Sequence, residues 1–217
     1  MPMRCDMKTI VCYGDSNTWG YIPGSAEERY PYDIRWTGVL QRLLGAEYHV
    51  IEEGLNGRTT CFEDPTWPDR NGFASLPVIL ESHFPMDLIL IMLGSNDAKH
   101  IFPGKPYACG RALELYVRQI RGSGYGPDKK DPEILVVSPV LVRQCVTSDS
   151  FDPVMSVRFT QELGNVYRKY ADALHVHFLD AAAVAQADDA DGLHMNAQGH
   201  AALARALQEK ILSILEV

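Results

Sequence analysis

The sequence predicts an α/β fold, a three-layer α/β/α sandwich on a flavodoxin-like sheet of five parallel strands. Apolar runs rich in β-branched residues alternate with amphipathic stretches along the chain. The five runs cover residues 9–14, 48–53, 87–93, 133–138 and 176–180. Residues 88–93 and 134–137 are apolar without alternation, which is typical of parallel strands covered on both faces. We expect the common strand order 2-1-3-4-5.

Helices are predicted between these runs. The first covers 36–44, where apolar residues recur at helical spacing and Gly45 ends the helix. A second begins at Asp152 and Pro153, because Asp caps a helix and Pro fits its first turn. Asn196 caps the last. The apolar stripes of the two later helices are Phe159, Leu163, Val166, Tyr167, Tyr170 and Leu174, and Leu203, Leu207, Ile211 and Ile214.

The 217 residues suit a single domain over 1–217. Three connections are long, over 17–35, 58–72 and 139–152, and each follows the carboxyl end of a predicted strand. Loops of this length are more often functional than accidental. The glycine-rich stretch 122–127 follows a helix and precedes a strand, the reverse of a phosphate loop, so we interpret it as a connector.

Composition and charge limit the partners. Hydrophobic residues make up 46% and charged residues 22% of the chain, the balance of a globular protein. The formal net charge is −8, and Lys and Arg are scattered, which argues against nucleic acid or an anionic membrane as the main partner. No apolar run approaches the ~20 residues that a membrane span needs. We expect a small-molecule substrate.

Cysteine usage predicts a reducing compartment. Residues 1–8 lack the apolar core of a signal peptide. The cysteines form an odd set without CxxC spacing, which indicates neither a disulfide framework nor a zinc site. They are Cys5, Cys12, Cys61, Cys109 and Cys145. We expect a cytoplasmic protein without metal or cofactor.

Four polar blocks follow the carboxyl ends of predicted strands, at 14–17, 56–57, 94–97 and 191–194. In parallel sheets these ends meet at one edge, where α/β proteins build their sites. The last block follows the fifth strand. In the expected order this strand lies three spacings from the first strand, roughly 14 Å at ~4.8 Å per spacing. Residues 180–191 span up to about 35 Å when extended, so this block can reach the others.

The four blocks, in this order and spacing, resemble those of the SGNH (GDSL-type) hydrolases, and the match covers the whole chain. The bacterial arylesterase/acyltransferase branch is similar in the stretches GDSNTWGY, RWTGVL, VIEEGLNGRTT, IMLGSND and DGLH. Asn17 departs from the broader pattern, where many members have leucine. The resemblance implies a serine esterase, with acyl transfer to alcohols as a further activity beside hydrolysis.

The resemblance also assigns site residues. Ser16 would be the nucleophile, and His194 the base that a weakly nucleophilic hydroxyl needs. Asp191 would orient the imidazole and stabilise its charged form. The oxyanion of the tetrahedral intermediate would be held by the backbone N–H groups of Ser16 and Gly57 and by the side-chain amide of Asn96.

Other residues near these blocks receive supporting roles. We expect Trp19, Phe151 and Val154 to wall a narrow apolar pocket that favours short acyl chains. Dry walls of this kind would let an alcohol compete with water for the acyl-enzyme. Long loops rich in aromatic residues also predict burial against another subunit, and hence a homo-oligomer.

Three further polar residues are predicted to be structural. A carboxylate beside a site usually accepts backbone N–H bonds, and we expect this of Asp15 and Asp97. Arg58 is expected to pair with an acidic neighbour such as Glu52 or Glu53 rather than to face the substrate.

Simpler interpretations remain for each block. Ser16 can serve only as a helix cap, Asn96 can belong to an ordinary turn, and His194 can be a surface residue. Two other functions also stay open: a carbohydrate O-acetyl esterase of the same superfamily, and a non-catalytic flavodoxin-like binding module whose 14–18 loop grips phosphate.

Overall fold

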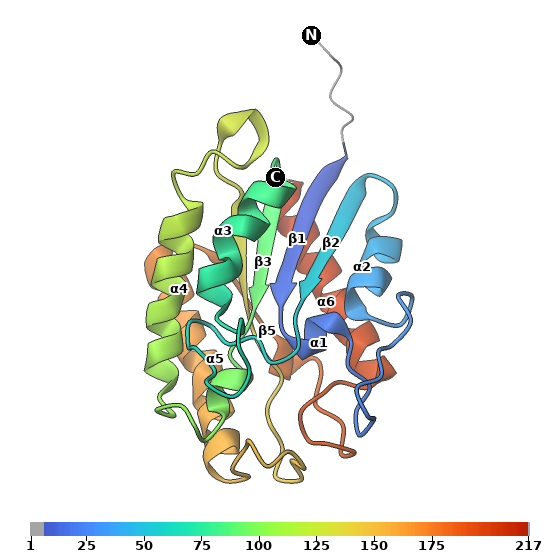
Figure 1. Cartoon of the computed structure of the whole chain (residues 1–217). Helices are drawn as coiled ribbons and strands as arrows, with labels where there is room; N and C mark the ends of the chain where they lie inside the picture. Colours follow the sequence, from blue (N-terminus) through green and yellow to red (C-terminus); the bar gives the residue numbers. More distant parts are fainter. Residues whose placement is uncertain (1–6, 217) are drawn as a thin grey trace.

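A computed structural model describes residues 7–216 and contains a sheet of five parallel strands with helices on both faces (Figure 1). The strands are β1 (Lys8–Gly14), β2 (Tyr48–Gly54), β3 (Leu88–Met92), β4 (Glu133–Ser138) and β5 (His177–Asp180). The helices are α1 (Ser16–Trp19), α2 (Trp36–Leu44), α3 (Gly72–His83), α4 (Pro106–Ile120), α5 (Met155–Leu174) and α6 (Ala197–Leu215). Cys5 and most of the segment predicted to lack a signal peptide lie outside the described residues.

The strand order is β2-β1-β3-β4-β5, as predicted. β1 lies between β2 and β3, and it pairs with β2 from Lys8 opposite Tyr48 to Gly14 opposite Gly54. The observed strands differ from the predicted runs by one residue at some ends. The chain reverses its direction along the sheet between β1 and β3, so polar residues after these two strands face a common crevice.

Each face of the sheet has its own apolar core. Side chains of alternate strand residues, such as Ile10 and Leu90, pack with α2 and α6 on one face. Their neighbours, such as Val11 and Ile89, pack with α3, α4 and α5 on the other. Figure 1 shows this division into three layers. Because both faces are covered, β3 is buried along its whole length, which explains its continuous apolar sequence.

Two of the three predicted helix ends are found as predicted, while α5 begins later than at Asp152 and Pro153, with Val154 as its N-cap residue. α2 covers the predicted residues 36–44 and ends at Gly45. α5 begins at Met155, two residues after Pro153, because the Asp152 carboxylate accepts the N–H groups of residues 154 and 155 at 2.9 and 2.7 Å. Asn196 caps α6 by accepting the N–H of Gly199 at 2.9 Å.

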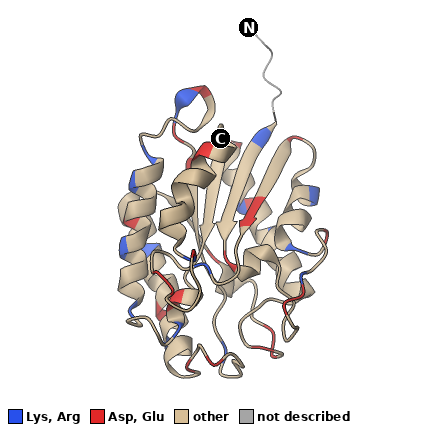
Figure 2. Cartoon of the chain, in the orientation of Figure 1, with Lys and Arg blue, Asp and Glu red and all other residues tan. Residues whose placement is uncertain are grey.

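Charges are distributed rather than gathered. Figure 2 shows Lys and Arg interspersed with Asp and Glu along the helices and loops. Among residues 7–216, no helix combines the length and the apolar character needed to cross a bilayer.

Candidate active site

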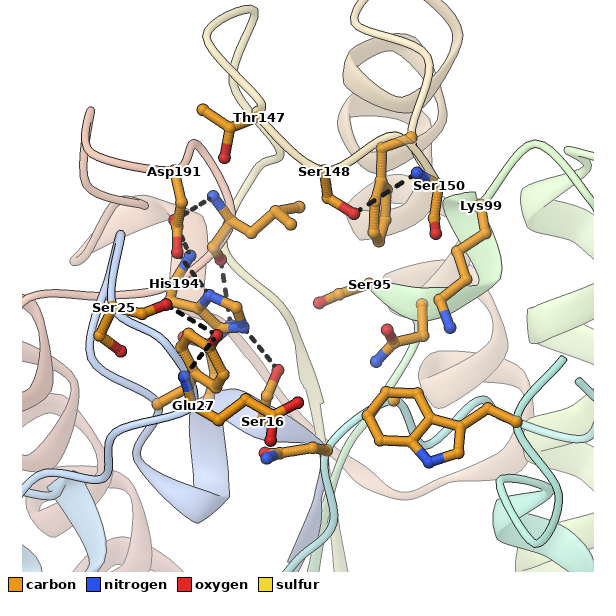
Figure 3. A pocket seen from close by; sticks show the side chains of 18 of the residues that line it. Ser16, Ser25, Glu27, Ser95, Lys99, Thr147, Ser148, Ser150, Asp191 and His194 are labelled. Carbon is orange, nitrogen blue, oxygen red and sulfur yellow. Dashed lines mark hydrogen bonds and ion pairs between the residues drawn. The ribbon is translucent and has the colours of Figure 1, made fainter.

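The polar blocks meet at the carboxyl edge of the sheet, as the strand order requires (Figure 3). Ser16 is the first residue of the short helix α1, directly after β1. Asp15 caps this helix, and its carboxylate accepts the N–H of Asn17 at 3.0 Å. The tight turn from strand to helix therefore presents the Ser16 hydroxyl at the edge of the sheet.

Ser16, His194 and Asp191 form a continuous line of hydrogen bonds. Nε2 of His194 lies 2.9 Å from Oγ of Ser16, and Nδ1 lies 2.7 Å from Oδ2 of Asp191. Ser16 and Asp191 are buried, and the side chain of His194 is 14% exposed. This arrangement lets the imidazole take a proton from the hydroxyl on one side while the carboxylate orients it on the other.

The Asp191 carboxylate is held as an anion. Its Oδ1 accepts the N–H groups of Leu193 and His194, both at 2.9 Å, and its Oδ2 accepts the N–H of Gly24 at 3.2 Å. Burial alone would raise the pKa of Asp191, but the bonds from His194 and Leu193 outweigh burial and lower the pKa to about 2. A charged carboxylate beside the imidazole favours the protonated ring that forms when His194 accepts a proton.

Two further residues fix the position of His194. The ring of Tyr21 stacks on the imidazole with centroids 4.3 Å apart and planes 22° apart. The Asn17 amide donates to the carbonyl of Leu193 at 3.2 Å and accepts the N–H of Met195 at 2.9 Å. Asn17, the departure from leucine noted in the sequence, thus ties the Ser16 turn to the loop that carries His194.

Gly57 and Asn96 approach the same edge from β2 and β3. Gly57 has φ +80°, a conformation that favours glycine. The Asn96 amide donates to the carbonyl of Arg58 at 3.1 Å, which orients the side chain. The Ser16 N–H, at the start of α1, lacks an intrahelical partner. The geometry therefore brings together all five residues to which the resemblance gives roles.

The residues expected to be structural have structural contacts. Asp97 accepts the N–H of Thr60 at 3.0 Å, and burial raises the pKa of its carboxyl group. Arg58 donates to the carbonyls of Gly14 and Glu53, and its guanidinium lies 4.1 Å from the ring centre of Tyr13. Arg58 thus pairs with backbone carbonyls rather than with the carboxylates that the sequence suggested.

Asp15→Asn is expected to change the pH dependence of stability. Burial raises the pKa of Asp15 to about 6 from its ordinary 3.8. The folded protein binds the Asp15 proton more tightly than the unfolded chain does. The contribution of this proton to the free energy of unfolding is therefore complete below about pH 4 and is lost as the pH rises through about 6. Asn stays neutral, so the variant should gain about 2–3 kcal/mol of unfolding free energy relative to wild type between pH 4 and pH 8. Urea denaturation at both pH values measures this; a constant difference would contradict it.

A pocket of about 630 Å³ is bordered by the five residues with proposed catalytic or oxyanion roles, which are Ser16, Gly57, Asn96, Asp191 and His194. Phe151 lines it, as predicted. The structure does not place Trp19 or Val154 on its wall, which corrects the predicted pocket. Trp19 ends α1, and its ring packs against the guanidinium of Arg29 at 5.0 Å. Val154 immediately precedes α5 and is 72% exposed.

Other pocket residues were not singled out from the sequence. Tyr21 and Trp67 line the pocket, and both come from the long connections 17–35 and 58–72. Their aromatic character was visible in the sequence, but other loop aromatics pack elsewhere. Phe62 and Phe102, for example, stack on each other at 5.3 Å. No pattern of sequence spacing distinguishes the loop aromatics that line the pocket from those that pack elsewhere.

The described residues offer no obvious metal site. Within residues 7–216, no group of three or more His, Cys, Asp or Glu side chains is arranged to hold an ion. Cys12, Cys61, Cys109 and Cys145 are free thiols.

The chain is similar to several known proteins. Residues 12–202 match the model of the GDSL-like lipase/acylhydrolase family. An arylesterase from Vibrio mimicus is 34% identical over 118 residues, which cover 53% of this chain and half the length of that protein. The arylesterase of M. smegmatis is 40% identical, with a TM-score of 0.90 over 96% of this chain and all of that one.

A carbohydrate acetylesterase family member from Sinorhizobium meliloti is 39% identical, with a TM-score of 0.89 over 97% of this chain and all of that one. The family match spans the strands and loops that supply the Ser16, Gly57, Asn96 and His194 positions. This chain belongs to the GDSL-like lipase/acylhydrolase family, a family of ester hydrolases.

Proposed function

We propose that this chain hydrolyses short-chain carboxylic esters through an acyl-enzyme on Ser16. The observation that carries the proposal is the line of hydrogen bonds from Asp191 through His194 to Ser16, at 2.7 and 2.9 Å. Family membership supports an ester hydrolase over the phosphate-binding module that the sequence left open.

In the proposed mechanism, Oγ of Ser16 attacks the ester carbonyl carbon while its proton passes to Nε2 of His194. The tetrahedral intermediate then collapses, and the leaving alcohol takes that proton from His194. Water attacks the acyl-enzyme with the same base, which releases the acid and restores the Ser16 hydroxyl. Asp191 stabilises the imidazolium in both halves of the reaction.

The negative charge on the carbonyl oxygen needs donors. The backbone N–H groups of Ser16 and Gly57 and the amide of Asn96 would supply them. Among residues 7–216, the N–H of Gly57 has no protein acceptor, which leaves it free for the oxyanion. Both N–H groups sit on turns fixed by neighbouring contacts, so no reorganisation is needed as the charge develops.

Short acyl chains are the expected substrates. Phe151 and Trp67 line the pocket with bulky rings. We expect kcat/KM for p-nitrophenyl acetate to exceed that for p-nitrophenyl octanoate by about tenfold or more, because we expect these rings to crowd a long acyl chain. Steady-state hydrolysis of the even-numbered series from acetate to octanoate measures this. Faster turnover of octanoate than of acetate would refute the short-chain assignment.

A carbohydrate O-acetyl ester is the second candidate substrate. The pocket carries hydroxyl side chains at Thr147, Ser148 and Ser150, which suit a polyhydroxylated substrate, and the S. meliloti relatives are described as carbohydrate acetylesterases. Acetate release from acetylated xylose or glucose at least as fast as from phenyl acetate, at equal concentration, would favour the sugar ester.

Acyl transfer to an alcohol is the proposed second fate of the acyl-enzyme. The rings of Tyr21 and Phe151 line the pocket among mostly polar side chains, and these rings would favour an alcohol over water where they contact the acceptor. Addition of ethanol to a p-nitrophenyl butyrate reaction should divert product into ethyl butyrate. Formation of butyrate alone would limit the enzyme to hydrolysis.

The proposal extends to assembly and location. Tyr107, Val154 and Met155 are 62%, 72% and 61% exposed, which supports a homo-oligomer that covers apolar surface. A light-scattering mass equal to one 24.2 kDa chain would refute it. The free thiols of Cys12, Cys61, Cys109 and Cys145 support a cytoplasmic location, which cell fractionation would test.

A further inference from the structure

Trp67 lies on the side of the pocket away from His194. Figure 3 shows His194 and Lys99 on opposite sides of the pocket. The Trp67 ring centre lies 5.7 Å from Nζ of Lys99, so the indole belongs to the Lys99 side. The same ring packs against Gly57, because a Cβ added there would lie 2.7 Å from Cε3 and Cζ3 of Trp67.

Asp64 holds the backbone of Trp67 in place. Its Oδ1 accepts the N–H of Trp67 at 3.2 Å and both the N–H and the hydroxyl of Thr66, at 2.9 and 2.6 Å. The carbonyl of Asp64 also accepts the Trp67 N–H at 3.2 Å. This turn fixes the backbone from which the Trp67 side chain extends to the pocket wall.

Two cations hold the indole ring itself. The guanidinium of Arg70 lies 4.3 Å from the ring centre, within the range of a cation–π contact, as is Lys99. Lys99 is in turn fixed by a 2.8 Å ion pair with Asp64. The side chain of Lys99 is 8% exposed and that of Asp64 is 1% exposed. Burial would raise the pKa of Asp64, but its bonds from Lys99 and Thr66 lower it to about 2, so the pair persists at neutral pH.

The chemistry of the proposed mechanism decides which part of the substrate this ring meets. His194 must protonate the leaving oxygen, so the leaving group lies on the His194 side. With the carbonyl oxygen at Gly57 and Asn96, the acyl group points to the opposite side, toward Trp67. Although it lines the pocket, Trp67 is 39% exposed, which leaves part of its surface free for contact with an acyl chain.

We propose that Trp67 is the specificity-determining residue of this esterase. Clamped by Asp64, Arg70 and Lys99, its ring bounds the acyl group and limits the chain length that enters. By packing against Gly57, the ring also positions the backbone N–H that receives the oxyanion. This inference rests on the proposed function and adds to it the residue that sets acyl selectivity.

The test compares Trp67→Ala and Trp67→Phe with wild type on p-nitrophenyl acetate and p-nitrophenyl octanoate. Removal of the indole should raise the octanoate-to-acetate ratio of kcat/KM by about tenfold or more, the effect of admitting roughly two more methylene groups. It should also lower kcat for acetate, because Gly57 loses its support. Trp67→Phe, which keeps an aromatic ring, should lie between the two.

Phe84→Ala is the matched control, since Phe84 is an exposed aromatic at the end of α3 that does not line the pocket. A change of less than about threefold in the ratio for Trp67→Ala, with the fold intact by circular dichroism, would overturn the inference. If Trp67→Ala does not fold, Trp67→Leu decides by the same criterion. Absence of Ser16-dependent hydrolysis in the wild type would instead refute the proposed function.

Discussion

Ser16→Ala is expected to abolish ester hydrolysis, with a fall in kcat on the order of 10⁶-fold. The 2.9 Å contact with His194 is the only route in the proposed mechanism by which a nucleophile is both activated and placed beneath the carbonyl. Alanine keeps the helix start, because the cap of α1 is the Asp15 side chain rather than the Ser16 hydroxyl. The melting temperature should therefore stay close to that of the wild type while kcat for p-nitrophenyl acetate collapses.

Two companion variants make this prediction specific. Ser16→Ala combined with His194→Ala should be about as slow as either single variant, because residues that act as one unit do not contribute additively. Ser213→Ala, an exposed serine on α6, should hydrolyse p-nitrophenyl acetate at the wild-type rate. A Ser16→Ala enzyme that retains more than about a tenth of the wild-type kcat would contradict the assignment of the nucleophile.

Asn96→Ala is expected to lower kcat by about 10²–10³-fold, equivalent to about 2.7–4 kcal/mol of lost transition-state stabilisation. The amide lies in the 3₁₀ turn after β3 and borders the same pocket as Ser16, and its bond to the Arg58 carbonyl fixes its direction. Since the charge on the carbonyl oxygen develops only in the transition state, KM should change much less than kcat.

Asn96→Asp separates the donor from the shape of the side chain. Aspartate keeps the size of asparagine but offers no N–H when ionised, so its loss of kcat should match or exceed that of alanine. Retention of most of the activity in Asn96→Asp would show that this amide does not stabilise an oxyanion.

The sheet and the line of site residues could be predicted because several signals agree. The continuous apolar sequence at 88–93 requires burial on both faces, and this in turn requires a parallel sheet between helix layers. Once that sheet is assumed, every residue just after a strand lies at one edge. Ser16, Gly57 and Asn96 follow β1, β2 and β3 closely and therefore meet there. His194 lies fourteen residues beyond the end of β5, so its place at this edge was implied by the resemblance to the SGNH hydrolases.

The pocket wall could not be predicted in the same way. The direction of a loop side chain depends on hydrogen bonds within the loop, such as the Asp64 turn that orients Trp67. Val154 looked like a wall residue beside Phe151, but in the turn that precedes α5, where its N–H bonds to the Asp152 carboxylate, its side chain is exposed. In helix α3 the apolar residues recur only weakly at helical spacing. This helix contains Pro77 and buries little of its apolar surface.

Covalent labelling of Ser16 tests the central claim most directly. A fluorophosphonate reacts with a serine hydroxyl only where a base and an oxyanion hole activate it. The folded protein should gain one adduct by intact mass, and peptide mapping should place it on Ser16. Labelling should disappear in Ser16→Ala and in His194→Ala. A folded wild type that takes up no label, or takes it up on another residue, would contradict the proposed serine esterase.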